Sequence, residues 1–145
     1  MLKQIKIILT IFIFLNCFKV VFSAENFFIE GQKKYDEKKF EDSKFLFQRN
    51  IVFNPKDANS YLYLAKIFNF EKNDKEELKN LNTTLLLEPN NEEAIYMLIG
   101  IKLKKSNYSE VKTLLKKFSI VCTNLCKKTN KIKEDLKNIE PKDES

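Results

Sequence analysis

The sequence has no histidine and no tryptophan, one arginine, two glycines and three prolines in 145 residues. Without histidine there is no imidazole general base, no Ser-His or Cys-His nucleophile pair and no imidazole metal ligand. The scarcity of glycine and proline favours long helices joined by short turns over a sheet protein with many turns. The length allows one domain. We expect no cofactor, no metal site, no small-molecule substrate and no enzyme activity.

The N-terminal segment 1–23 has the features of an export signal. Lys3 and Lys6 give a positive start, and Ile7 to Leu15 is an apolar core that only Thr10 interrupts. Such a core is typical of a signal peptide and is shorter than the roughly 20 apolar residues of a membrane span. We therefore expect an exported chain that faces the periplasm and is tethered to a membrane through its N-terminus.

Three fates of this segment remain open. In the first, a signal peptidase cuts after Ser23 or Ala24. In the second, the stretch from Phe14 to Cys17 is a loose lipobox, so that Cys17 becomes a lipidated N-terminus in the outer membrane. In the third, the segment stays as an uncleaved anchor, because Val20 to Phe22 extends its apolar stretch.

The charge balance argues against a nucleic-acid partner. The segment 1–23 holds three lysines and no acid, so without it 26 basic residues fall to 23 against 20 acidic ones, a net charge of +3. Nucleic-acid binders typically combine arginine-rich clusters with stacking aromatics, and Arg49 is the only arginine. The lysines between Lys102 and Lys117 form either a solvated helix face or a basic patch for an acidic partner or anionic lipid.

Two prolines mark an internal repeat. The spacing from Pro55 to Pro89 is 89 − 55 = 34, and each proline follows an apolar run and precedes a polar pair that opens a new apolar-periodic segment. A fixed period of this length indicates one supersecondary unit stacked on copies of itself. With the proline at position 32, the units run over 24–57, 58–91 and 92–125. Residues 126–145 are then a capping helix with a frayed tail.

In this register the chain resembles the tetratricopeptide repeat (TPR) family. The family's large, small and aromatic positions are matched by Phe27, Gly31, Phe40, Ser43 and Phe47, by Tyr61, Leu64, Ala65, Phe68, Leu81 and Thr84, and by Ile95, Leu98, Tyr108, Val111 and Leu115. Asp74 and Glu77 depart from the pattern, and the third unit lacks the closing proline. The resemblance implies an all-α solenoid of about three helical hairpins and a C-terminal capping helix, preceded by the signal or anchor helix.

Two polar pairs predict where second helices of the hairpins begin. Asp74 with Glu77, and Asn107 with Glu110, have the spacing of a capping pair, in which the second residue lies three positions after the first. Each pair precedes an apolar stripe of helical period. We therefore expect helices to start at these two points.

The resemblance also indicates a binding surface. In this family, fixed positions on the first helix of each hairpin line a concave groove that holds a segment of a partner protein. Ten residues carry those positions here: Phe28, Gln32, Tyr35, Leu62, Lys66, Asn69, Phe70, Tyr96, Leu103 and Lys104. The Lys and Asn that clamp a terminal carboxylate in chaperone-binding relatives are absent, so we expect an apolar and aromatic groove. The alternative is that Phe28, Leu62 and Tyr96 are buried between repeats.

Cys122 and Cys126 are the cysteines that survive any processing. In a continuous helix they share one face and would pack in the core, whereas a disulfide requires the helix to end between them. A zinc site needs four ligands, and the pair offers two. Packing, a disulfide and a thiol or metal function therefore remain open.

Together these features predict a non-catalytic adaptor of the cell envelope that binds another protein. The opening from Asn26 to Tyr35 is similar to the repeat lipoprotein of the bacterial outer-membrane β-barrel assembly machinery. That similarity suggests an outer-membrane β-barrel assembly protein as the partner. The alternatives are a self-associating structural envelope or secretion-system component, and a thiol or metal protein that uses Cys122 and Cys126.

Overall fold

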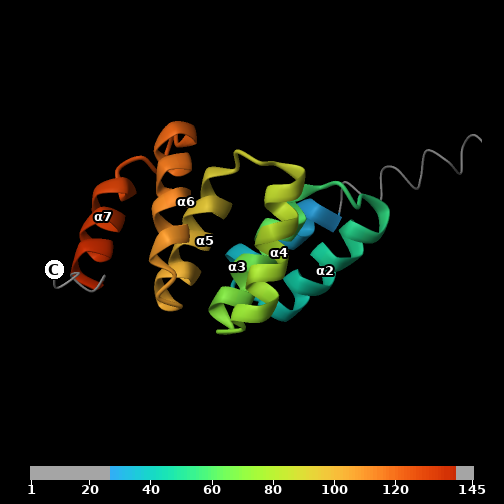
Figure 1. Cartoon of the computed structure of the whole chain (residues 1–145). Helices are drawn as coiled ribbons and strands as arrows, with labels where there is room; N and C mark the ends of the chain where they lie inside the picture. The colour runs from blue at the N-terminus through green and yellow to red at the C-terminus, as the bar shows by residue number, and fades with distance from the viewer. Residues whose placement is uncertain (1–26, 140–145) are drawn as a thin grey trace, which may run out of the picture. The chain divides into compact units, whose positions relative to one another are not determined.

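The computed structural model describes residues 27–139, and all regular secondary structure in that range is helical (Figure 1). Residues 27–36 form the first described helix. The others are α2 (Phe40–Phe53), α3 (Ala58–Phe70), α4 (Asp74–Leu87), α5 (Glu92–Lys104), α6 (Tyr108–Val121) and α7 (Lys128–Ile139). The predicted all-α class is confirmed. The predicted signal segment, Cys17 and the frayed tail lie outside the described residues.

The chain divides within α3 into two compact units, one ending at Tyr63 and the other beginning at Leu64. In the first unit, residues 27–36 and α2 form a helical hairpin that leads into the start of α3. In the second unit α5 packs against both α4 and α6, and α7 packs against α6. Among residues 27–139, no helix combines the length and apolarity needed to cross a bilayer.

Three turns within hairpins share one backbone geometry, and they follow one another at the same spacing as the two prolines. Lys38, Lys72 and Ser106 have φ values of 59°, 57° and 53°. In each turn the following residue donates a backbone hydrogen bond five positions back, as in Lys39 N to Lys34 O at 2.9 Å, with equivalents of 2.9 and 3.0 Å in the other two turns. This is the Schellman ending of a helix, which most often uses glycine. The backbone therefore repeats the same turn at these three positions, although none of the residues is a glycine.

The caps at the starts of α4 and α6 test the two predicted capping pairs. Asn107 is the N-cap of α6, and its amide donates to the Glu110 carboxylate at 2.8 Å, so this pair is confirmed. The predicted pair of Asp74 and Glu77 is wrong, because Asn73 is the N-cap of α4 and accepts from Glu76 N at 3.3 Å. Lys72, the left-handed residue, ends the turn. The N-cap therefore lies at Asn73, one position before the Asp74 that the sequence pattern predicts.

The first unit is built on aromatic rings around one glycine. The Phe47 ring is fully buried and lies 4.9 Å from the Tyr63 ring and 5.7 Å from the Phe28 ring, centroid to centroid. A Cβ atom on Gly31 would lie 2.9 Å from the Phe47 ring, so the helices approach closely there. Ser43 Oγ donates to the Gly31 carbonyl at 2.8 Å across the same contact. Small residues at these two positions therefore allow the hairpin to close.

A buried polar network precedes α3 in the same unit. The amide nitrogen of Asn50, a residue 2% exposed, donates to Asp57 Oδ2 at 2.8 Å and to Ser60 Oγ at 2.9 Å. Ser60 Oγ donates to the same Asp57 carboxylate at 2.6 Å. Satisfied buried networks of this kind hold a turn in one geometry. This network fixes the turn that contains Pro55.

The second unit has a mainly aliphatic core that α7 completes. Seven buried side chains form the cluster: Ile95, Ile99, Val111, Leu115, Phe118, Ile132 and Leu136. Ile132 and Leu136 come from α7 and cover the face of α6 that would otherwise meet water. The end of an array of helical hairpins needs a helix that is apolar inside and polar outside. α7 has this arrangement.

Candidate functional site

Three predicted groove residues of the first unit gather around one tyrosine. Tyr63 accepts a hydrogen bond from Gln32 Nε2 at 3.0 Å, and its ring lies 5.9 Å from the Phe28 ring and 5.1 Å from the Tyr35 ring. All four side chains are half-buried. Tyr63 was not predicted as a groove residue, because the position next to it, Leu62, carries the family's groove position.

Leu62 lies in the core, since it is 5% exposed. The sequence left open that Phe28, Leu62 and Tyr96 are buried, and of these three Leu62 is buried. Phe28 and Tyr96 are half-buried, so each keeps an accessible edge. Helical periodicity in the sequence predicts which residues share a face of the helix. It does not show how much of that face the neighbouring helices cover.

The second unit contains a pocket of about 290 Å³. Its walls come from α3 to α5 and from α7: Asn69, Glu77, Tyr96, Met97, Ile99, Gly100, Ile101, Leu103, Lys104, Lys131, Ile132 and Asp135. Four predicted groove residues, Asn69, Tyr96, Leu103 and Lys104, are among them. Two are not: Lys66 pairs with Glu93 at 2.8 Å, and Phe70 is 67% exposed elsewhere on α3.

Glu77 is a buried carboxylate in the wall of this pocket. The residue is 1% exposed, and Oε1 accepts from Asn69 Nδ2 at 2.9 Å. Oε2 has no hydrogen-bond partner among the described residues. Burial raises the pKa of the Glu77 carboxyl, while the Asn69 hydrogen bond and the charge of Lys104 act in the opposite direction. A buried acceptor left unpaired costs free energy, and Glu77 Oε2 is such an acceptor among the described residues.

Gly100 leaves open space on the α5 wall. A Cβ atom built there would meet nothing within 4 Å. Glycine in the middle of a helix costs roughly 1 kcal/mol relative to alanine, and packing within the described chain does not require it here. The gap therefore widens the pocket at a cost to the helix.

The α7 wall of the pocket was missed in the sequence. Lys131, Ile132 and Asp135 line it, whereas capping of the array was the main role expected for α7. Ile132 does both, since it is 4% exposed in the core cluster and also borders the pocket. The amphipathic pattern of α7 could have indicated which residues flank its apolar stripe, but not that α5 would lie opposite them.

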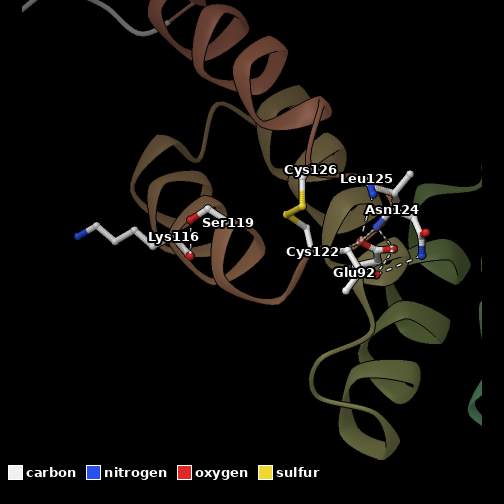
Figure 2. The surroundings of a disulfide bond; sticks show 8 residues. Glu92, Lys116, Ser119, Cys122, Asn124, Leu125 and Cys126 are labelled. Atoms are coloured by element: carbon white, nitrogen blue, oxygen red, sulfur yellow. Dashed lines mark hydrogen bonds between the residues drawn. A yellow bond between two sulfur atoms is a disulfide. The ribbon is translucent and has the colours of Figure 1, made fainter.

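A disulfide closes the loop between α6 and α7. α6 ends at Val121, and the Cys122 and Cys126 sulfurs are bonded with their Cα atoms 5.2 Å apart (Figure 2). The condition that the helix end before the second cysteine is therefore met. Cys126 is exposed and Cys122 half-buried, so packing of both thiols in the core is not their role. Within residues 27–139 no cluster of three His, Cys, Asp or Glu side chains could hold a metal ion.

Glu92, at the first turn of α5, binds the same loop through its carboxylate. Its oxygens accept the backbone N–H groups of Thr123 at 2.7 Å, Asn124 at 3.1 Å and Leu125 at 3.2 Å (Figure 2). These hydrogen bonds, that of Thr123 first, lower the pKa of Glu92 to about 2. Three amides on one carboxylate favour its charged form. The loop is thus held to the start of α5 by a side chain from a much earlier part of the sequence.

Fold and site together define an all-α domain of paired helical hairpins of the TPR type. No protein-family model matches the chain, and no curated protein matches it. The chain is similar in structure to the TPR2B domain of yeast Sti1, solved as a complex with pHsp70. The TM-score is 0.72 and the identity 14%, and the match covers 81% of this chain and 98% of that one.

Two further solved structures share the fold. The first TPR of Spaghetti (RPAP3), bound to the HSP90 peptide SRMEEVD, matches with a TM-score of 0.70 at 13% identity over 79% of this chain and 91% of that one. A chain of the CopN-Scc3 complex matches with a TM-score of 0.61 at 18% identity over 81% and 69%. At these identities the likeness establishes the fold alone.

Proposed function

We infer that this protein is a non-catalytic adaptor that binds a segment of another protein. The observation that carries this proposal is the pocket of the second unit, where four side chains from family groove positions line one concavity beside α7. The TPR-like fold supports it, because two of the solved structures that share the fold hold a bound peptide or protein according to their descriptions. A mixed wall of aromatic, aliphatic and charged side chains suits an extended or helical segment with one or two anchors.

The proposal includes export and tethering through residues 1–23, with a β-barrel assembly protein of the outer membrane as the partner to test first. Its support is the apolar core between Ile7 and Leu15 and the opening from Asn26 to Tyr35. The Cys122–Cys126 disulfide is compatible with an oxidising compartment. Mass spectrometry of the mature N-terminus tests this part, since a lipidated Cys17 supports outer-membrane tethering. A terminus at Ala24 or Glu25 contradicts tethering.

Site-specific photo-crosslinking in native membranes tests the adaptor function. A photoreactive amino acid at Met97, which lines the pocket, should crosslink to a partner protein. The matched control carries it at Leu86, which is 79% exposed on α4 and outside the pocket. Crosslinks from Met97 and not from Leu86 support the proposal. Crosslinks to a second copy of the chain favour self-association instead, and equal crosslinking at both positions contradicts a pocket-directed adaptor.

A further inference from the structure

The pocket of the second unit has a chemical preference of its own. Its apolar surface comes mainly from α5, with Tyr96, Met97 and Leu103, while two carboxylates, those of Glu77 and Asp135, come from α4 and α7. The wall also contains two lysines, Lys104 and Lys131. Lys104 is engaged by Asp74, with Nζ 3.6 Å from Oδ1. A ligand that satisfies the pocket must therefore supply both an apolar stem and a hydrogen-bond donor.

Glu77 determines which charge a group bound in the pocket would carry. One of its oxygens is occupied by Asn69, and the other has no partner among the described residues although the residue is 1% exposed. A carboxylate accepts hydrogen bonds and attracts cations, and hydrogen bonds to charged donors are stronger than neutral ones. Away from water the attraction between opposite charges is also less screened. A cationic donor would meet both needs, provided that the carboxylate turns toward it or exchanges its Asn69 hydrogen bond.

Gly100 provides room for the chain that carries this donor. The absence of a side chain leaves open space on α5 beside the buried carboxylate. A partner backbone can approach a helix closely at a glycine, as it cannot at a residue with a Cβ. This observation is independent of the charge argument, and both concern residues that line the same pocket.

We propose that the pocket between α5 and α7 is a subsite for one arginine or lysine side chain of the bound partner segment. The stem of that side chain lies along Tyr96 and Leu103, its cationic head pairs with Glu77 and Asp135, and its backbone passes over Gly100. The proposal rests on the proposed adaptor function and adds the chemistry of one anchor. An anionic anchor that binds Lys104 and Lys131 is the opposite outcome.

The two glycines of the chain allow a direct test in the full-length protein. Glycine-selective ¹⁵N labelling gives two backbone signals, Gly31 in the first unit and Gly100 in the pocket. The probes are end-capped heptapeptides with leucines on both sides of a central arginine, citrulline or glutamate. Citrulline keeps the shape of arginine and removes its charge. The arginine peptide should shift the Gly100 signal and leave Gly31 unchanged, and the citrulline peptide should bind about tenfold more weakly.

Variants separate recognition from folding. Glu77→Gln keeps the size of the side chain and removes its charge, so the preference for the arginine over the citrulline peptide should fall to what Asp135 alone supplies, with helicity and the Gly31 signal unchanged. Gly100→Leu should fill the open space and abolish binding of the labelled arginine peptide, measured by fluorescence anisotropy. If Glu77→Gln unfolds the chain, the Gly100→Leu variant and the comparison of the arginine and citrulline peptides still test the subsite.

Several results contradict the subsite without touching the adaptor function. Equal or tighter binding of the citrulline or glutamate peptide overturns the cationic anchor. So does an arginine preference that Glu77→Gln leaves intact, or an unmoved Gly100 signal at several millimolar of every peptide. In each case, crosslinking from Met97 to a partner would still support the adaptor function, because it requires proximity and not a charged anchor.

Discussion

The two units close the same kind of hairpin with different side chains. The first packs rings, with Phe47 at the centre and Gly31 pressed against it. The second packs mainly aliphatic side chains around Phe118 and adds two ties at the loop after α6, the short-range Cys122–Cys126 disulfide and the long-range contact of the Glu92 carboxylate. Both use the same left-handed turn. The turns therefore maintain the backbone repeat, whereas the core chemistry is free to differ.

The extra ties of the second unit are located where the array ends. α7 packs mainly against α6, so it has less apolar cover than a helix with two neighbours. A crosslink and a bound carboxylate compensate for this shortage by limiting how far the preceding loop can move. Variants of each unit separate the two solutions, from the largest expected effect to the smallest.

Phe47→Ala should cause the largest loss and affect the first unit. The ring is fully buried, and truncation of a buried phenylalanine costs about 3–5 kcal/mol. Denaturant unfolding measures the change in free energy. The matched control is Phe45→Ala on the same helix, where the ring is 59% exposed and the expected change is within about 0.5 kcal/mol. Similar losses in both variants would contradict the ring-centred core.

Removal of the disulfide should weaken the second unit by about 2 kcal/mol, as expected for a crosslink that closes a very short loop. The Cys122→Ser, Cys126→Ser variant should lose hydrogen-exchange protection in α7 and keep it in α2. Reduction of the wild-type protein should give the same shift in the unfolding midpoint. A reductant effect that persists in the double variant would show that another group is responsible.

The two glycines should respond to alanine with opposite signs. Gly31→Ala places a Cβ atom 2.9 Å from the Phe47 ring and should destabilise by about 1–3 kcal/mol through overpacking. Gly100→Ala meets nothing within 4 Å and should stabilise by up to about 1 kcal/mol through helix propensity. Thermal and denaturant unfolding measure both. If both variants changed the free energy of unfolding in the same direction, the distinction between a packed glycine and an open one would be wrong.

Glycine at the left-handed turns should stabilise both units alike. Lys38→Gly and Lys72→Gly relieve a positive φ at a non-glycine residue, which should stabilise each by about 1 kcal/mol or less. The control is Lys79→Gly in the middle of α4, which should destabilise by about 1 kcal/mol. A gain in one unit and a loss in the other would show that the turns are not equivalent.

Glu92 should stabilise the fold at neutral pH and lose this contribution in acid. Its folded pKa is lowered from 4.5 to about 2, so its contribution is present above pH 4.5 and is lost as the pH falls toward 2. Glu92→Gln should flatten that part of the stability curve, and solvent around this exposed carboxylate keeps the effect small. Glu77 has the opposite sign, because burial raises its pKa, so folding favours its protonated form relative to the unfolded chain. Its contribution is lost as the pH rises through the folded value.

Much of the architecture could be predicted because it depends on local patterns. The prolines Pro55 and Pro89 gave the period, and α3 and α5 begin at Ala58 and Glu92, the first residues of the predicted second and third units. The left-handed turns escaped prediction, because their residues are Lys, Lys and Ser and not glycine. The Asn73 cap was misassigned by one residue for the same reason.

The site was less accessible to prediction. Asn69, Tyr96, Leu103 and Lys104 were identified through the family's groove positions and line the pocket. Leu62 was predicted at a groove position, with burial as the alternative, and lies in the core, and Tyr63 was missed. One residue along a helix turns the side chain by about 100°, so a stripe in the sequence leaves neighbouring positions hard to separate.

The sequence by itself determined that the chain is helical, that it repeats with the spacing of Pro55 and Pro89, and that its last helix has one apolar face. These properties follow from composition, turn residues and helical period, which act over a few positions. Only the tertiary structure decided that Cys122 and Cys126 are bonded, that Glu92 holds their loop, and that Glu77, Gly100 and Asp135 share one pocket. The disulfide depends on where α6 ends, and the Glu92 and pocket contacts join parts of the chain that only the packing of the helices brings together.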